Sequence, residues 1–338
     1  MHSQLKISPA RYGMLTDRIL AWYAANKRPM PWRDQPNAYR VWISEIMLQQ
    51  TQVATVIPYF KRFVDRFPDI ASLAEAEQDD VLKLWEGLGY YSRARNLHKA
   101  AKLVIDSHDG QIPGSFCELC KLPGLGDYTA AAIASIVYGE AIPAVDGNVL
   151  RVVARWRGLP DDIGKTSTRD SIRAWLTPFT SPAPADFNQA MMELGALVCR
   201  PRQPRCLACP LQSECVALAT GRIDELPVKA RRKPVPTRTR LAAVIRDDDR
   251  ILLRQRSDNE MLGGLWGLPM AENPEELGCE VRKELAMVKH TYSHFHLHLT
   301  AWSCELRNPL PDTTWVPLST LDSLAFDKAT LKLLAKIS

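Results

Sequence analysis

The chain has 338 residues, of which 46% are hydrophobic and 24% charged, and this ordinary globular composition allows two domains with apolar cores. The longest apolar run, 130–137, is too short to span a bilayer, and the polar start at 1–7 does not resemble a signal peptide, so a cytoplasmic location is expected. The net charge of +5 permits a nucleic-acid partner without requiring one.

Amphipathic segments with short Gly and Pro punctuation recur from residue 11 to about 222, which predicts an all-helical domain over 1–222. The helices expected there are Met14–Asn26, Tyr39–Phe67, Asp79–Gly87, Ala94–Asp106, Thr129–Gly139, Val149–Arg157 and Phe187–Val198. Basic residues mixed with prolines predict a linker at 223–236. Strand signals then predict a smaller α+β domain over 237–338. Its expected elements are strands at Leu241–Arg246, Ile251–Arg256 and His294–Glu305 and a helix at Asp327–Ile337.

Glu45 lies among apolar residues of the second expected helix. Its helical neighbours at minus four, minus three and plus three are Val41, Trp42 and Leu48. A carboxylate in apolar surroundings has a raised pKa and keeps its proton near neutral pH, as a general acid requires. The competing interpretation is a solvent-exposed glutamate on an amphipathic helix, which periodicity alone favours.

The stretch 122–129, with the sequence LPGLGDYT, carries two glycines around a bulky residue and predicts a tight turn. Thr129 then opens a helix of small residues at 130–135, and backbone N–H groups at such a helix start can hold an anion. We interpret the segment at about 117–139 as a helix-hairpin-helix that clamps a DNA-backbone phosphate independently of sequence. A plain helical turn is the alternative.

Asp146 ends an apolar extended stretch, directly before the helix expected at Val149–Arg157. Aspartate is a common N-cap, and the same position at a helix start favours an ionised carboxylate that can face a developing cation. A protonated Glu45 and an ionised Asp146 would resemble the division of labour between two carboxyl groups in glycoside cleavage.

Four cysteines follow the spacing C-x6-C-x2-C-x5-C, at Cys199, Cys206, Cys209 and Cys215. Four thiolates that converge suit one [4Fe-4S] cluster, because each iron takes one sulfur ligand. Structural zinc usually binds two close pairs, and here a single close pair is present. Disulfides conflict with a reducing cytosol. Zinc and free or paired thiols stay open as alternatives. Arg200, Arg202 and Arg205 beside the first cysteines are placed to face phosphates.

The hairpin, Asp146 and the four cysteines together resemble the endonuclease III superfamily of helix-hairpin-helix DNA glycosylases. Three longer strings, starting at Trp42, Gly87 and Phe187, are similar to the MutY family of adenine DNA glycosylases. The resemblance covers nearly the whole chain. It implies base excision repair of double-stranded DNA, in which adenine mispaired with 8-oxoguanine or guanine is flipped out and its N-glycosidic bond hydrolysed.

The resemblance also implies roles for individual residues. Glu45 would protonate adenine N7, and Asp146 would stabilise the oxocarbenium-like sugar or bond to it transiently, with support from Asn148 and Tyr128. Bifunctional relatives carry a Schiff-base lysine at the position of Tyr128, so this chain is expected to be monofunctional. The residues that match DNA- or base-contacting positions are Trp32, Arg33, Leu48, Gln50, Thr51, Tyr90, Gly124, Gly126 and Thr129. Asp127 departs from the family, since many relatives carry a basic residue there.

The last hundred residues resemble the NUDIX-like C-terminal domain of the same family. The segment 263–269 fits that domain, but 275–284 lacks the spaced glutamates of a pyrophosphatase, so a reader of DNA is expected and not a second enzyme. Tyr292, Ser293 and His294 match the loop that recognises 8-oxoguanine, with tyrosine at the family's usual phenylalanine position.

Two rival functions compete with an adenine glycosylase. A pyrimidine-lesion glycosylase with lyase activity conflicts with the missing lysine and the additional C-terminal domain. A catalytically silent DNA-binding or iron–sulfur electron-transfer protein conflicts with the presence of both Glu45 and Asp146. Nothing in the sequence implies a membrane or a protein partner, and a monomer is expected. In a bacterium the protein would be associated with the nucleoid.

Overall fold

The computed structural model describes residues 9–34, 36–230 and 234–337. The chain folds into two compact units. Unit 1 takes 1–50 and 103–231, and unit 2 takes 51–102 and 232–338. Each unit is therefore built from two separate stretches of chain, and the boundaries expected at 222 and 237 stay predictions. Within the described residues, no helix combines the length and the apolar character needed to cross a bilayer.

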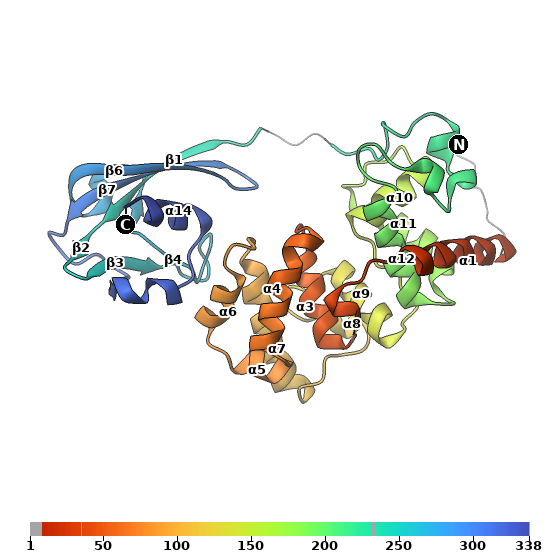
Figure 1. Cartoon of the computed structure of the whole chain (residues 1–338), viewed down its shortest axis with the longest axis horizontal. Helices are drawn as coiled ribbons and strands as arrows, with labels where there is room; N and C mark the ends of the chain where they lie inside the picture. The colour runs from red at the N-terminus through yellow and green to blue at the C-terminus, as the bar shows by residue number, and fades with distance from the viewer. Residues whose placement is uncertain (1–8, 35, 231–233, 338) are drawn as a thin grey trace. The chain divides into compact units, whose positions relative to one another are not determined.

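Unit 1 is helical. Its helices are α1 (Pro9–Asn26), α2 (Pro31–Asp34), α3 (Ala38–Leu48), α8 (Phe116–Leu119), α9 (Asp127–Tyr138), α10 (Gly147–Arg157), α11 (Thr166–Thr180), α12 (Pro184–Leu197) and α13 (Val216–Ala219), with 3₁₀ turns at Cys206–Ala208 and Gln212–Glu214. Figure 1 shows α10, α11 and α12 gathered beside α1. Aromatic rings fill their common core: Trp156 meets Trp175 edge to face, and Phe179 stacks on Phe187.

The amphipathic pattern of α10 determines how it is placed. Val149, Val153 and Trp156 recur at helical spacing and are all buried in the core of unit 1. The helix starts at its N-cap Asp146 and stops at Gly158, which adopts a left-handed φ of +64°. Local sequence thus determines where α10 begins and ends. Its first turn also fixes the position of Asp146, the candidate catalytic aspartate.

The single helix expected at Tyr39–Phe67 is wrong. The structure has two helices there, α3 and α4 (Val53–Arg66), because Gln50 adopts a φ of +57° that a right-handed helix cannot contain. No glycine or proline marks this break in the sequence. The interruption places Gln50 in an exposed turn between the two helices.

The helices of unit 2 are α4, α5 (Ile70–Glu75), α6 (Gln78–Trp85) and α14 (Lys328–Ile337), and α7 (Ser92–His108) begins in this unit and ends in unit 1. Phe63 lies at the centre of the α4–α6 packing, edge to face against both Phe67 and Trp85. These rings are fully buried, so apolar burial holds the inserted helices together.

The strands of unit 2 form two four-stranded sheets. They are β1 (Thr237–Val244), β2 (Arg246–Asp247), β3 (Arg250–Gln255), β4 (Trp266–Gly267), β5 (Met270–Ala271), β6 (Glu280–Thr291), β7 (His296–Glu305) and β8 (Thr313–Pro317), with 3₁₀ turns at Pro274–Leu277 and Leu318–Ser323. One sheet has the order β5-β1-β7-β6, and the other joins β2, β3 and β4 with β8 against β3. Strand β6 was not among the expected strands, and β7 begins two residues later than expected. Figure 1 shows β1, β6 and β7 side by side with α14 beside them.

The predicted architecture is confirmed: a helical region is followed by a smaller α+β region. Strand β7 pairs parallel with β1 and antiparallel with β6, and its residues Leu297, Leu299 and Ala301 share a core with Leu333 of α14. Alternate residues of a strand face the same side of a sheet, so the apolar residues at 297, 299 and 301 all point into this core.

Direct contacts join the two stretches of chain within unit 2. The carboxylate of Asp79 in α6 accepts hydrogen bonds from Gln255 Nε2 at 2.7 Å and Trp266 Nε1 at 3.2 Å. Gly264 has a φ of +78°, and a Cβ there would lie 2.8 Å from Leu82 Cδ1. Glycine therefore permits the close approach of the strand region to α6.

Candidate active site

Glu45 is buried, with 5% of its surface exposed, on a helix whose residues Val41 to Met47 are all buried. The interpretation as a solvent-exposed glutamate is therefore wrong. The pKa of Glu45 is raised to about 7, chiefly by burial and also by the negative charge of Asp146, while the Tyr128 hydroxyl and Arg33 oppose that rise. Glu45 can thus hold a proton near neutral pH.

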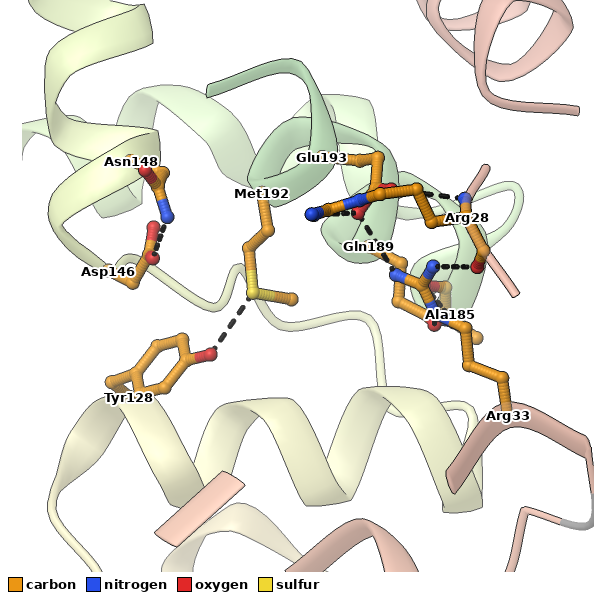
Figure 2. Close-up of polar contacts among 9 residues, drawn as sticks. All are labelled: Arg28, Arg33, Tyr128, Asp146, Asn148, Ala185, Gln189, Met192 and Glu193. Atoms are coloured by element: carbon orange, nitrogen blue, oxygen red, sulfur yellow. Dashed lines mark hydrogen bonds and ion pairs between the residues drawn. The ribbon is translucent and has the colours of Figure 1, made fainter. Parts of the chain in front are cut away.

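Tyr128 from α9 contacts Glu45 and Met192 together. Its hydroxyl oxygen lies 2.6 Å from Glu45 Oε2 and 3.1 Å from Met192 Sδ, and Figure 2 shows the latter contact. A phenol has one proton, so it can donate to one of these acceptors at a time. When Glu45 is ionised, Tyr128 donates to the carboxylate. When Glu45 is protonated, the carboxyl group donates to the phenol oxygen, and the phenol proton can turn to the sulfur.

Asp146 is the N-cap of α10. Its Oδ1 accepts from the Val149 N–H at 2.8 Å, and its Oδ2 accepts from Asn148 Nδ2 at 2.8 Å, as Figure 2 shows. The capping role suggested by the sequence is confirmed. Burial raises the pKa of Asp146 from its usual value, and these hydrogen bonds together with Arg151 oppose that rise. The helix start alone would lower the pKa, so burial is the stronger influence here.

Arg151 connects Asn148 to the cysteine region, and sequence reasoning missed it. Its Nη2 donates to Asn148 Oδ1 at 2.8 Å, and its Nε donates to the Cys199 carbonyl oxygen at 2.7 Å. Gly195 of α12 allows this packing, because a Cβ there would lie 2.5 Å from Asn148 Cβ. The spacing of three residues between Asn148 and Arg151 is the signal that could have identified the pair on one helix face.

A second polar group surrounds Glu193 of α12. Arg28 Nε lies 2.6 Å from Glu193 Oε1, and Arg33 Nη2 lies 3.4 Å from Glu193 Oε2. Arg33 also donates to Gln189 Oε1 at 2.9 Å, and Figure 2 shows this set beside Met192. Trp32, which precedes Arg33, is buried. Arg33 is thus held by Gln189, Glu193 and the Arg28 carbonyl oxygen, to which its Nη1 donates at 2.9 Å. Glu193 was not identified from the sequence as part of the site.

The expected hairpin is present, and its helix starts earlier than predicted. Gly124 has a φ of +81°, and Gly126 is the N-cap of α9, which begins at Asp127. Thr129 is buried and accepts a hydrogen bond from Gln49 Nε2 at 3.1 Å. The carboxylate of Asp127 pairs with Arg173 of α11, whose Nη2 lies 2.9 Å from Oδ2. The chain therefore provides a cation beside the acid that departs from the family pattern.

Four of the expected DNA-contacting residues lie near two turns: Leu48 ends α3, Gln50 and Thr51 follow it before α4, and Tyr90 lies between α6 and α7. In unit 1, Leu48 is half-buried and Gln50 is exposed. In unit 2, Thr51 and Tyr90 both contact Arg93, which is itself buried. Tyr90 is exposed in a left-handed conformation with a φ of +49°. Residues held in such sparsely populated conformations cluster at functional sites.

Arg93 holds the turn that carries Tyr90. Its Nη2 donates to the Gly89 carbonyl oxygen at 2.9 Å and to Thr51 Oγ1 at 3.4 Å, and its guanidinium lies over the rings of Trp85 and Tyr90. A planar guanidinium with several donors can satisfy such a set of carbonyl and hydroxyl oxygens at once.

The four cysteines line a common cavity near the end of unit 1. Val152, Arg155 and Trp156 of α10 form part of its wall. Arg155 is buried, and its Nη1 donates to Cys199 Sγ at 3.6 Å and to the Arg200 carbonyl oxygen at 2.7 Å. Among the described residues, no group of three or more His, Cys, Asp or Glu side chains is arranged to hold a metal ion. In a [4Fe-4S] cluster each iron takes one cysteine sulfur, so the four cysteines need to surround the cluster and not to meet at one metal ion. Four cysteines around one cavity, with Arg155 beside the Cys199 sulfur, fit such a cluster.

The expected base-reading residues lie in the turn between β6 and β7. Ser293 and His294 are exposed, while Tyr292 is half-buried. The Tyr292 N–H donates to the Phe295 carbonyl oxygen at 2.9 Å, and the Tyr292 hydroxyl donates to Asp327 Oδ1 at 2.8 Å. The turn thus presents two polar side chains to solvent and anchors the third.

Comparisons with known proteins match both parts of the chain. Residues 43–178 match the family described as HhH-GPD superfamily base excision DNA repair protein, and residues 241–336 match the NUDIX domain family. An adenine DNA glycosylase of Buchnera aphidicola subsp. Acyrthosiphon pisum is 35% identical over 83% of this chain and 83% of its own length. The human adenine DNA glycosylase is also 35% identical, over 88% of this chain and 68% of its own length.

Solved structures support the helical fold. A thermostable thymine-DNA glycosylase covers 62% of this chain and 97% of its own chain, with a TM-score of 0.56 and 24% identity. Endonuclease III in a non-covalent DNA complex covers 63% of this chain and 98% of its own chain, with a TM-score of 0.53 and 21% identity. These likenesses concern the fold of the helical part.

Proposed function

The chain belongs to the adenine DNA glycosylases of the HhH-GPD base excision repair superfamily, and from that premise we propose that Glu45 and Asp146 carry out the cleavage of adenine from A:8-oxoguanine and A:G mispairs. It is a DNA N-glycosylase, which hydrolyses the bond between a base and its sugar. The observation that carries the proposal is the pair of adjacent carboxyl groups with different surroundings, one with a pKa near 7 and the other bonded as an N-cap.

The first step is protonation of the leaving base. Adenine leaves the stack and enters the space bounded by Glu45 and Tyr128. The protonated Glu45 gives its proton to adenine N7, which makes the base a better leaving group. The electron pair of the C1′–N9 bond then passes to adenine, and positive charge develops at C1′ and the ring oxygen of the sugar.

The second step is neutralisation of that charge. Asp146 is ionised in this proposal and is oriented by the Val149 N–H and by Asn148. Its negative charge stabilises the cationic sugar until water adds to C1′. The water oxygen forms the new bond, and its released proton restores Glu45. Tyr128 carries a phenol in place of an amine, and the enzyme is therefore monofunctional and leaves an abasic site.

The four cysteines hold one [4Fe-4S] cluster in this proposal. The cluster supplies structural organisation to the loop at 199–206, where Arg202 and Arg205 are exposed and available to phosphates. Arg155 places a positive charge at the first cysteine sulfur, which suits an anionic cluster. Protein purified without oxygen is expected to be brown and to contain iron and sulfide. A colourless, zinc-loaded protein would refute the assignment.

The exposed Ser293 and His294 are proposed to read 8-oxoguanine on the opposite strand. Deleting 237–338 would be a poor test, since it would uncover the helices with which this region shares unit 2. Substituting Ser293 and His294 by Ala avoids that problem. The expected result is a larger loss of activity on A:8-oxoguanine than on A:G. Equal losses on both duplexes would argue against a reader.

Single-turnover base release tests the whole proposal. End-labelled duplexes carry A opposite 8-oxoguanine, G, C or T, and are analysed with and without alkali. We expect alkali-dependent cleavage at A that is fastest opposite 8-oxoguanine. Glu45→Gln is expected to abolish release and to keep mismatch binding, while the exposed Glu75→Gln serves as the matched control. Full activity of Glu45→Gln would eliminate the general-acid role.

A further inference from the structure

A short connector segment, Leu324–Asp327, contacts two turns of unit 2 that are proposed to bind DNA, the turn at 87–91 and the turn at 292–294. On one side it contacts α6 and the loop that follows. Lys83 Nζ donates to the Leu324 carbonyl oxygen at 3.0 Å, and the Phe326 N–H donates to Glu86 Oε1 at 2.8 Å. The backbone of this segment is therefore held by side chains from the inserted helices of the same unit.

Tyr91 ties the connector segment to the turn that carries Tyr90. The Tyr91 hydroxyl accepts from the Gly87 N–H at 3.1 Å and donates to the Phe326 carbonyl oxygen at 3.2 Å. Tyr91 is buried, and the next residue toward the N-terminus is the exposed Tyr90. The Tyr91 hydroxyl thus closes the 87–91 turn by its bond to Gly87 and links this turn to the connector segment by its bond to Phe326.

Asp327 ties the connector segment to the β6–β7 turn. It is 2% exposed, and its carboxylate accepts five hydrogen bonds. The donors are Tyr292 Oη, Arg256 Nη2, the Ala329 N–H, the Thr330 N–H and Thr330 Oγ1. Two of these bonds, from the Ala329 and Thr330 N–H groups, cap α14, and the Thr330 hydroxyl adds a third bond from the same helix, so the carboxylate is fixed by the helix, and Arg256 compensates its charge. Tyr292 is then held by an anchor that cannot easily move.

We propose that Asp327 is a positioning residue for 8-oxoguanine recognition, which holds the Tyr292–His294 turn at a fixed distance from the Tyr90 turn through the connector segment. The inference rests on the proposed reading role of Ser293 and His294. The two turns then meet DNA as one preorganised surface, and less binding free energy is lost in ordering them. The hydroxyl of Tyr292 is the atom that makes this anchor possible, since phenylalanine has no donor to offer.

Tyr292→Phe removes that hydroxyl and retains the ring that packs edge to face on His290 and at 4.9 Å from Phe295. The readout is the ratio of affinities for duplexes that hold 8-oxoguanine or guanine opposite a non-cleavable adenine analogue. A hydrogen bond to a charged group predicts a fall in this ratio of about tenfold. Tyr138→Phe is the matched control, because its hydroxyl also makes one hydrogen bond, to the Ile112 carbonyl oxygen, and Tyr138 belongs to unit 1 while both turns belong to unit 2.

A purely structural role would lower the unfolding temperature and weaken both duplexes equally, without a change in their ratio. Asp327→Asn is the second variant, since an amide oxygen can still cap α14 while the charge beside Arg256 and Tyr292 is lost. A lower ratio in both variants supports the inference. A wild-type ratio in a folded Tyr292→Phe protein overturns it. A wild-type enzyme without preference for 8-oxoguanine overturns the reader proposal itself, so the two failures are distinguishable.

Discussion

Replacing Tyr128 by Phe tests how the surroundings of Glu45 set its proton affinity. The Tyr128 hydroxyl lies 2.6 Å from Glu45 Oε2 and lowers the pKa of Glu45 by donating to the ionised form. A hydrogen bond to a charged group contributes about 1.5–3 kcal/mol, and part of it persists when the protonated Glu45 donates instead. The remaining difference of roughly 1.4 kcal/mol corresponds to about one pH unit.

The sign of the effect follows from the proposed role of Glu45 as an acid. Its protonated form is active, so single-turnover base release should be constant at low pH and fall as pH rises through about 7. Tyr128→Phe should move this decline up by about one unit. At pH 8 the protonated fraction of Glu45 would increase about fivefold, while at pH 6 it would hardly change.

The assay is a pH–rate profile of base release at saturating enzyme for both proteins. The height of the plateau can change for other reasons, so the position of the decline is the quantity to compare. A decline that stays in place or moves to lower pH in Tyr128→Phe would refute the argument that this hydroxyl lowers the pKa of Glu45.

Three further predictions concern other contacts. Burial raises the pKa of Glu45 above its ordinary value of 4.5, so the folded state loses stability as the pH rises from about 4.5 through about 7. Glu45→Gln should therefore have the same free energy of unfolding in urea as the wild type at pH 4, and a free energy of unfolding ~1–3 kcal/mol larger at pH 8. Arg151→Gln, which loses donors to Asn148 and the Cys199 carbonyl oxygen, should slow base release at least about tenfold with DNA affinity unchanged in titrations; wild-type rates would contradict this. Arg173→Ala should weaken binding to undamaged DNA and reduce the salt dependence of that binding, and adding Asp127→Asn to this variant should restore part of the affinity. Unchanged affinity in both variants would show that Arg173 does not contact DNA.

The sequence predicted the parts of the site that depend on local chemistry. Asp146 is the N-cap that its position before a helix indicated, and Gly124 and Gly126 form the expected turn. The burial of Glu45 was not visible in periodicity, because α3 is buried on nearly all sides and so lacks a polar face to compare with an apolar one.

The parts that sequence patterns missed are produced by tertiary packing. Met192 meets Tyr128 because α12 packs near α9, and Arg151 reaches Cys199 because α10 packs against α12. No local signal encodes such meetings. The break at Gln50 was also missed, since a left-handed non-glycine residue is imposed by the surrounding structure and not by its own preference.

The discontinuity of unit 1 has a consequence for synthesis on the ribosome. Helix α3, which carries Glu45 and is buried on nearly every side, is made before the inserted stretch 51–102 and well before α9, α10 and α12. Apart from its contact with α2, its apolar surface lacks its main native partner until α9 emerges. The nascent chain therefore passes through a period in which Glu45, the proposed proton donor, lies on a hydrophobic helix that is only partly covered. Chaperone binding during translation is the expected response of a cell to that exposure.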